Sequence, residues 1–402
     1  MKVLMVFPYY ATSYRTGMIS VLNNLPESLK KKNCEVKTIM FTDSEKASNE
    51  TDSKDDILIY AKKVNLLSLR HLASEVKRET LNERYDIVHG HTGTSVLYKA
   101  LGSNVPACVT NHGIGYKVYH FYWKYRVVKS RSDFLPYLNY FPKKVFDTII
   151  GRLLYGLADR VTTVSSFTKH EVSEIYGVPE EKIDPVPNGV QTDLFTPNIP
   201  KEEKEKIMER YDLEKALLFL PPVPRKGLHL LIRALPAIVK EVPNLKLLVV
   251  GAIPTSDAYY KFCHELSKRL NVEERVLFVG WIDDGDLPKY YSVASAYVLP
   301  TLYEALPITV LESMACGTPV CASRWGGLLE IITDGEDGLL FDPTNTASLA
   351  DALVTILSDD TLQRRMSFNA RKKIERQYSW GHIADQYIKV YEKTIQNLHS
   401  RN

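Results

Sequence analysis

The sequence has few cysteines, and none are spaced to build a disulfide framework or a zinc site. The 402-residue chain has five cysteines, which are scattered and never form a C-x-x-C pair. This usage is typical of a reducing compartment. A run of about 18 apolar residues is also missing, so no transmembrane helix is expected. The first residues lack the pattern of a secretory signal, and we therefore expect a cytoplasmic protein.

Two common phosphate-binding motifs are absent as well. No G-x-G-x-x-G follows the first apolar run, which argues against a nicotinamide-dependent dehydrogenase. No G-x-x-x-x-G-K-[ST] occurs, which argues against a P-loop NTPase. An excess of one charge is also lacking, because the formal net charge is only +3. That value is too small to indicate a nucleic acid partner.

Short apolar runs alternate along the chain with longer stretches of helical periodicity. Most runs are continuous, as is typical of strands buried on both faces of a parallel sheet. Strand–helix alternation predicts an α/β fold with parallel sheets. We expect two doubly wound domains facing a cleft, with ligands beyond the carboxyl ends of the strands. The runs are 2–7, 36–41, 86–90, 106–110, 161–165, 216–220, 245–251, 276–280, 296–300 and 318–322.

A stretch rich in proline, glycine and asparagine, from Pro185 to Pro200, separates two groups of runs and is interpreted as a linker. We place the N-terminal domain at 1–190 and the C-terminal domain at 191–383. The last helix, 384–402, is expected to pack back on the N-terminal domain. Two domains also fit the length of the chain, at about 100–200 residues per domain.

One segment combines a strand end with a sharply bounded helix. The apolar run ending at Pro300 is followed by Pro307, which suits the first turn of a helix because its missing N–H costs nothing there. Gly317 suits the left-handed residue after a helix, and Pro319 prevents continuation. The pattern therefore predicts a helix over about 307–316.

The N-terminus of this helix is a candidate anion site. Its first N–H groups, at Ile308 and Thr309, have no intrahelical acceptor and favour a diphosphate, aided by the helix dipole. Glu304 lies in the loop before the helix and Glu312 lies further along it. Carboxylates can accept hydrogen bonds from sugar and ribose hydroxyls without a metal. Two isolated glutamates would more often be solvated helix residues, but the flanking pattern favours a binding role.

The segment from Val298 to Pro319 resembles the E-x7-E signature of retaining glycosyltransferases of family 4, which have the GT-B fold of two Rossmann-like domains. Other pieces resemble the family in the same order over nearly the whole chain. These pieces are Asp86–His91, Thr110–Gly113, Ala158–Ser165, Val186–Val190, Arg225–Gly227, Gly326–Glu330, Asp334-Gly335 and Gly338–Leu340.

The resemblance implies that the N-terminal domain binds the acceptor and that the C-terminal domain binds the nucleotide-sugar donor, and it implies roles for residues of the C-terminal domain. Glu304 would bind the donor sugar and Glu312 the ribose, while Lys226 would neutralise the diphosphate. The amides of Ile308 and Thr309 would cap the diphosphate. Family members often carry an arginine five residues before the lysine, where this chain has Pro221, so Arg225 is expected to supply that charge. Ile282 would lie beside the base.

The resemblance also implies roles for two residues of the N-terminal domain. His112 would reach the donor sugar from the opposite side of the cleft, and Gly17 would let the first loop approach the phosphates. The implied reaction moves a hexose-type sugar from a nucleoside-diphosphate sugar to a saccharide or lipid-linked acceptor. It retains anomeric configuration and uses no metal or other cofactor. A sugar-nucleotide epimerase of the same fold and a non-catalytic nucleotide-sugar binder remain as alternatives.

Two further features allow more than one interpretation. His89 and His91 form an H-x-H at a strand end and could join His112 in a metal site, but no acidic partner stands out at ligand spacing, and no metal is expected. The segment 116–152 is rich in aromatic and basic residues. It could contact a membrane surface as a peripheral anchor, or the acceptor, or form a core helix pair with a solvated basic face.

Overall fold

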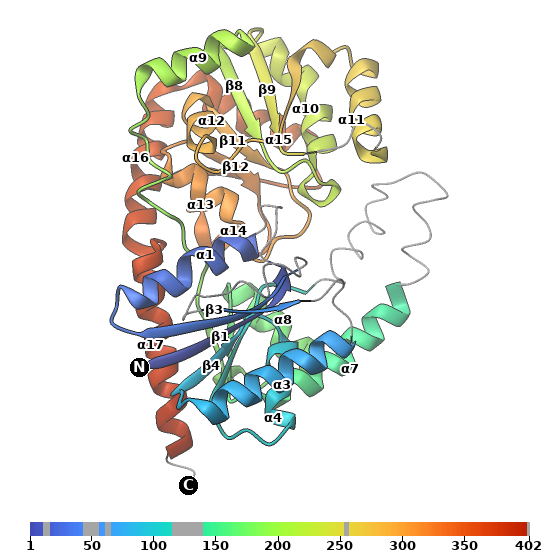
Figure 1. Ribbon diagram of the computed structural model, residues 1–402. Coiled ribbons are helices and arrows are strands. Elements are labelled where there is room, and N and C mark those ends of the chain that lie inside the picture. The colour runs from blue at the N-terminus through green and yellow to red at the C-terminus, as the bar shows by residue number, and fades with distance from the viewer. Residues whose placement is uncertain (11–16, 43–55, 61–65, 115–139, 253–256, 400–402) are drawn as a thin grey trace. The chain divides into compact units, whose positions relative to one another are not determined.

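The computed structural model describes residues 1–10, 17–42, 56–60, 66–114, 140–252 and 257–399. They form two compact units, which we call the N-terminal and C-terminal units (Figure 1). The N-terminal unit holds the described residues up to 114, residues 140–189 and the chain from Trp380. The C-terminal unit holds Val190–Ser379. The expectation that the two domains face a cleft stays a prediction.

The N-terminal unit is built on a seven-stranded sheet in the order β3-β2-β1-β4-β5-β6-β7. Every neighbouring pair is parallel. The strand order reverses between β1 and β4, which makes this the topological switch point of the sheet. The strands are β1 (Lys2–Tyr10), β2 (Glu35–Thr42), β3 (Asp56–Tyr60), β4 (Ile87–Gly90), β5 (Ala107–Asn111), β6 (Arg160–Thr163) and β7 (Ile183–Pro185).

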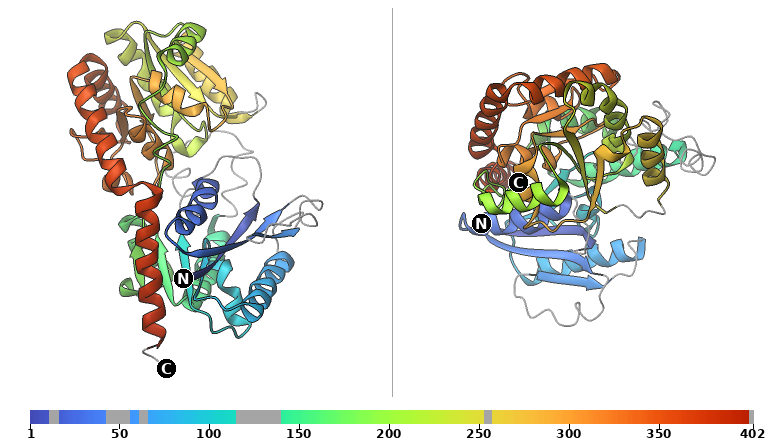
Figure 2. Two further views of the ribbon diagram at one scale, coloured as in Figure 1. Left: turned by 60° about the vertical axis from the view of Figure 1, so that its left-hand side comes forward. Right: turned by 90° about the horizontal axis from the view of Figure 1, so that it is seen from above.

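Helices cover both faces of this sheet, because its central strands are apolar on both sides. Along β1, Leu4 and Val6 belong to one buried cluster, whereas Val3 and Met5 belong to the other. The second cluster includes residues of α1 and of the long α17, which pack together and run beside the sheet (Figure 2). The described helices are α1 (Gly17–Lys30), α3 (Leu66–Asn82), η1 (Gly93–Val96), α4 (Leu97–Ala100), α7 (Tyr140–Leu157), α8 (Ser166–Tyr176), η3 (Glu180–Lys182) and α17 (Trp380–His399).

The C-terminal unit has a six-stranded parallel sheet in the order β10-β9-β8-β11-β12-β13, and its switch point lies between β8 and β11. Its strands are β8 (Lys215–Phe219), β9 (Leu245–Val250), β10 (Val276–Gly280), β11 (Ala296–Leu299), β12 (Val320–Ser323) and β13 (Leu339–Phe341). Its helices are α9 (Lys201–Tyr211), η4 (Pro224–Lys226), α10 (Leu228–Glu241), α11 (Ala258–Arg269), η5 (Glu273–Arg275), α12 (Leu287–Val293), α13 (Ile308–Ala315), α14 (Leu328–Ile331), α15 (Thr346–Ser358) and α16 (Asp360–Gln377).

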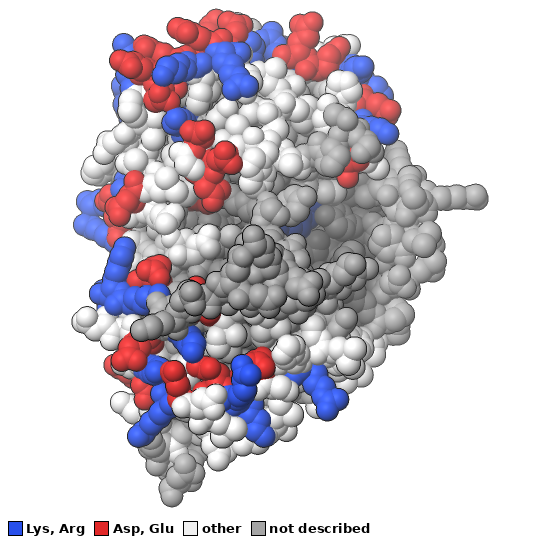
Figure 3. All heavy atoms as spheres, viewed as in Figure 1, with Lys and Arg blue, Asp and Glu red and all other residues white. Residues whose placement is uncertain are grey.

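The predicted α/β fold with parallel sheets is confirmed, and each of the ten expected runs is a strand. The strands β3, β7 and β13 were not predicted, because they are short strands at sheet edges and carry no long apolar run. No described helix is long and apolar enough to cross a bilayer. On the face shown in Figure 3, acidic and basic side chains are interspersed, as the small net charge leads one to expect.

Candidate functional site

The switch point of the C-terminal unit brings together residues that are far apart in the sequence. After β8, the chain passes through η4, which ends at Lys226; after β11, it forms the loop that carries Glu304 and leads into α13. Because β8 and β11 are parallel neighbours, both segments leave the same edge of the sheet. The sheet order therefore places the predicted cation and the predicted carboxylate at one site.

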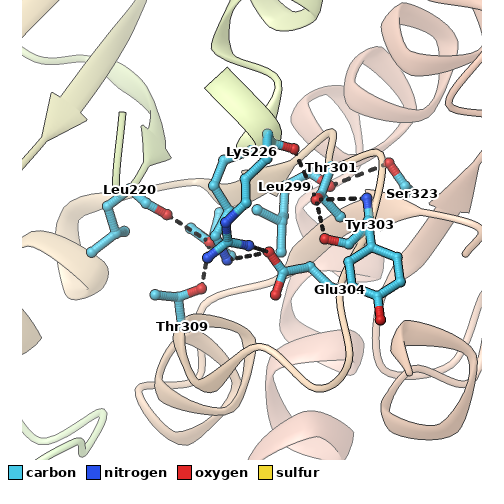
Figure 4. Close-up of polar contacts among 10 residues, drawn as sticks. Leu220, Lys226, Leu299, Thr301, Tyr303, Glu304, Thr309 and Ser323 are labelled. Carbon is cyan, nitrogen blue, oxygen red and sulfur yellow. Dashed lines mark hydrogen bonds and ion pairs between the residues drawn. The ribbon is translucent and has the colours of Figure 1, made fainter. Parts of the chain in front are cut away.

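Glu304 is held there by two cations (Figure 4). Its Oε1 lies 2.6 Å from the Nζ atom of Lys226 and is also paired with the guanidinium of Arg225. The side chains of Lys226 and Glu304 are only 5% and 8% exposed, whereas that of Arg225 is 35% exposed. The ion pair is therefore largely shielded from water, which strengthens it relative to a surface pair.

Burial and charge act in opposite directions on these groups. Burial lowers the pKa of Lys226 from 10.5 to about 8, although the negative charge of Glu304 acts to raise it. Burial acts to raise the pKa of Glu304, but the charges of Arg225 and Lys226 outweigh it and lower that pKa overall. At neutral pH, both the lysine and the carboxylate are therefore charged.

The backbone around the cations is fixed by a close approach of two loops. Gly227 has φ +83°, and a Cβ atom added there would lie 1.9 Å from the carbonyl oxygen of Pro300. Only glycine fits, because any side chain would enter the backbone of the other loop. The hydroxyl of Thr301 donates to the carbonyl of Arg225 at 3.1 Å, and the amide of Leu302 donates to the same oxygen at 3.3 Å.

The predicted helix after Glu304 is confirmed as α13. Pro307 is its N-cap residue, and Gly317 follows its end with φ +69°. The structure pairs no described acceptor with the amides of Ile308 or Thr309, as expected for the first turn of a helix. Their N–H groups are therefore donors at the same loop that carries Glu304.

Two buried tyrosines that sequence analysis did not single out hold this first turn. The hydroxyl of Tyr297 lies 2.7 Å from the Oγ1 of Thr309 and donates to the carbonyl of Leu220 at 3.1 Å. The hydroxyl of Tyr291 lies 3.0 Å from the Oε2 of Glu312, which is itself buried. In the sequence, both tyrosines look like ordinary core aromatics, and only their hydrogen bonds show the second role.

Two further residues predicted to contact the donor, Ile282 and Gly17, are not part of the ion cluster around Glu304. Ile282 is half-buried and follows the end of β10, the strand at one edge of the C-terminal sheet. Gly17 is the first residue of α1 in the N-terminal unit, and the loop residues 11–16 before it lie outside the described part of the chain. No contact in the structure tests the role expected for either residue.

Histidines gather at the switch point of the N-terminal unit. His89 is fully buried and uses both ring nitrogens: Nε2 lies 2.7 Å from the Oγ1 of Thr110, and Nδ1 lies 2.6 Å from the hydroxyl of Tyr391. No group of three or more His, Cys, Asp or Glu side chains in the described ranges could hold a metal ion. His89 is instead part of a polar network between the sheet and α17.

His91 and His112 contact each other. The Nδ1 of His91 lies 3.1 Å from the Nε2 of His112, and the His91 ring stacks on Phe7 with centroids 4.2 Å apart. Burial lowers the pKa of His112 to about 4, so this histidine is neutral at physiological pH. The Nε2 of His112 is therefore engaged by the neighbouring histidine of the same unit.

The aromatic and basic segment is described only in part. Residues 115–139 lie outside the described ranges, and 140–152 belong to α7. One face of α7 exposes large apolar side chains next to basic ones: Val145, Phe146, Ile149 and Leu153 are 42–63% exposed, and Lys144 and Arg152 are exposed as well. A helix that is buried on both sides would not show such a stripe.

Comparison with known proteins agrees with this architecture. A family model described as Glycosyltransferase Family 4 matches residues 16–194, and one described as Glycosyl transferases group 1 matches residues 200–373. The two models match the two parts of the chain that carry the two sheets.

Individual relatives are similar over shorter or longer stretches. An uncharacterised glycosyltransferase of Methanocaldococcus jannaschii is 36% identical over 243 residues, which are 60% of this chain and 61% of the relative. A protein of Mycolicibacterium smegmatis named GDP-mannose-dependent alpha-(1-6)-phosphatidylinositol monomannoside mannosyltransferase is 32% identical over 233 residues, 56% of this chain and 59% of the relative. The matches thus span about 60% of the length of these curated relatives.

A solved structure shows the same fold over almost the full length. Anabaena HepE in complex with UDP has a TM-score of 0.75 and 19% identity, and the match covers 98% of this chain and 100% of that chain. At this identity the likeness establishes the fold and not the substrate. Together with the two family models, it shows that this chain belongs to the glycosyltransferases of the GT-B fold.

Proposed function

We propose that this protein is a retaining glycosyltransferase that moves a hexose-type sugar from a nucleoside-diphosphate sugar to a saccharide or lipid-linked acceptor. The observation that carries the proposal is the pairing of Glu304 with Lys226 and Arg225 beside the unpaired amides of α13. Two cations and two amide donors suit a diphosphate. A carboxylate at the same site suits the hydroxyls of the sugar attached to it.

Donor binding would exchange the partners of this ion cluster. The diphosphate would take over Lys226, Arg225 and the amides of Ile308 and Thr309, and it would free Glu304 to accept hydrogen bonds from sugar hydroxyls. Such an exchange keeps every buried charge paired, which a buried ion pair requires. Glu312 would accept from the ribose and Ile282 would lie beside the base.

In the reaction, the bond between the anomeric carbon and the diphosphate breaks, and negative charge develops on the leaving group. Lys226 and the first turn of α13 would stabilise that charge. The acceptor oxygen would attack from the face that the diphosphate leaves, and the leaving phosphate would take its proton, so that configuration is retained. No metal or other cofactor is needed on this route, and His112 would contact the donor sugar from the N-terminal domain, with Gly17 letting the first loop approach the phosphates.

Similar proteins support the class of donor. The Mycolicibacterium relative is named for GDP-mannose, and the Anabaena structure holds UDP. The two nucleotides differ in base, so their shared chemistry is the nucleoside diphosphate, which is the part that the ion cluster and α13 would bind.

Thermal unfolding with a panel of nucleotide sugars tests the proposal, because a ligand that binds only the folded state raises the midpoint. We expect UDP-glucose, GDP-mannose or a related donor to raise it, and Lys226→Met to abolish the rise. Product analysis with labelled donor then separates the alternatives. An epimer formed without acceptor indicates an epimerase, and unchanged donor with every acceptor indicates a non-catalytic binder. A panel without any shift would refute a donor site.

We also propose that the protein works at the inner face of a membrane and contacts it through α7. Phe146, Ile149 and Leu153 offer an apolar stripe, and Lys144 and Arg152 can meet anionic headgroups. Co-sedimentation with vesicles containing phosphatidylglycerol should be clearly stronger than with pure phosphatidylcholine. A Phe146→Asp and Ile149→Asp double variant should no longer co-sediment with the phosphatidylglycerol vesicles. Equal, negligible sedimentation of wild type with both vesicles would refute the membrane contact.

A further inference from the structure

Tyr291, on α12, is a fully buried side chain whose hydroxyl reaches α13. It lies 3.0 Å from the Oε2 of Glu312 and 3.1 Å from the carbonyl oxygen of Thr309. A phenol has one proton to donate, and a carboxylate is a stronger acceptor than a carbonyl because the hydrogen bond is charge-assisted. The geometry therefore directs the Tyr291 proton to Glu312, with Thr309 as the weaker acceptor.

Tyr291 is itself held in place from several sides. The hydroxyl of Thr318 donates to its carbonyl oxygen at 2.7 Å. Its ring meets those of Tyr297 and Phe195 edge-on, with centroids 5.8 Å and 6.2 Å away. A side chain packed in this way has little freedom to turn. The Oε2 of Glu312 therefore has a donor at a fixed position before any ligand arrives.

Such a donor stabilises Glu312 in place, because the residue is only 2% exposed. A buried carboxylate that lacks donors turns toward water or takes up a proton. Glu312 also lies near the ion cluster, since its charge acts to raise the pKa of Lys226. A carboxylate that is fixed in position beside the diphosphate site is what recognition of ribose hydroxyls requires.

We propose that Tyr291 is a positioning residue that holds Glu312 for the ribose and thereby sets the preference of the site for ribonucleotides over deoxyribonucleotides. This inference rests on the proposed donor site. Without the phenol, the Oε2 of Glu312 loses the donor that fixes its position, and the gain from a ribose hydroxyl falls. The diphosphate contacts, which involve Lys226 and the first turn of α13, remain.

The test is calorimetric binding of UDP and GDP and of their 2′-deoxy and 3′-deoxy counterparts. In wild type, loss of the hydroxyl that meets Glu312 should weaken binding about 10- to 100-fold, because it removes a charge-assisted hydrogen bond to a buried carboxylate. In Tyr291→Phe, the same loss should weaken binding about threefold or less. Tyr290→Phe is the matched control: it lies on the same helix, its hydroxyl pairs with Tyr211, and it should keep the wild-type ratio.

A merely structural role would lower the affinity for ribo- and deoxyribonucleotides equally and leave their ratio unchanged, and that outcome overturns the proposal. Glu312→Gln provides the second variant. This variant should also bind ribo- and deoxyribonucleotides with similar affinity. Adding Tyr291→Phe to Glu312→Gln should not change the ratio of the two affinities any further. Wild type that binds no nucleotide refutes the donor site and this inference with it. Wild type that binds without discrimination refutes the inference alone.

Discussion

The lowered pKa of Lys226 leads to a specific pH dependence of donor binding. The shift from 10.5 to about 8 corresponds to about 3 kcal/mol against the charged lysine, and it arises because burial removes the ammonium from water. A diphosphate that docks on this lysine adds negative charge and raises its pKa again. The donor therefore binds the protonated form, and binding above pH 8 must be accompanied by proton uptake.

The sign and size of the effect follow from the pKa. Below about pH 7 the lysine is charged both free and bound, so affinity does not change with pH. At pH 8 about half of the free protein has lost this proton, and binding should take up about 0.5 proton. At pH 9 the affinity should be about tenfold weaker than at pH 7. A nucleotide sugar is the right probe, because its esterified diphosphate does not titrate in this range.

Titration calorimetry in buffers of different ionisation enthalpy, such as Tris and HEPES, measures the affinity at each pH and the number of protons taken up on binding. Lys226→Met should bind weakly at every pH and take up no proton. Lys246→Met, which removes a lysine paired with Asp212 outside the site, should keep the wild-type profile. If the affinity of wild type is constant from pH 7 to 9, this lysine does not contact the diphosphate. The same conclusion follows if the affinity of Lys226→Met falls with pH as steeply as that of wild type.

Three further changes have defined consequences. Glu304→Gln keeps the shape of the side chain but removes its charge, so steady-state kinetics should show kcat/KM about 100-fold lower while circular dichroism stays unchanged. Gly227→Ala places a Cβ against the carbonyl oxygen of Pro300, so it should lower the thermal midpoint and abolish nucleotide binding. Tyr391→Phe removes the hydroxyl paired with the Nδ1 of His89, and denaturant unfolding should show a loss of about 1–3 kcal/mol without any change in nucleotide affinity.

A second glycine variant is the control for Gly227→Ala. Gly285→Ala should leave stability unchanged, because nothing lies within 4 Å of the added atom and no positive φ is needed there. Normal turnover in Glu304→Gln, normal stability in Gly227→Ala, or weakened nucleotide binding in Tyr391→Phe would each contradict the role given to that residue.

The elements that sequence analysis found were those with strong local signals. The buried parallel strands stood out as continuous apolar runs, and α13 stood out because Pro307 and Gly317 mark its two ends. The short strand β7 was not predicted, because three residues at the start of a proline-rich stretch carry too little periodicity. The importance of Lys226 and Glu304 came from resemblance to a family, since no local pattern links two residues so far apart.

The fold class and the position of the candidate helix could be predicted from the order of the amino acids, because hydrophobic periodicity and helix-ending residues act over a few neighbouring positions. Which groups meet depends on the folded chain, which pairs Arg225 with Glu304, 79 residues apart, and brings Tyr291 to Glu312 and His91 to His112. Such contacts depend on sheet order and on which strand ends share an edge. A linear pattern does not contain that information, because the same runs can be arranged in more than one order.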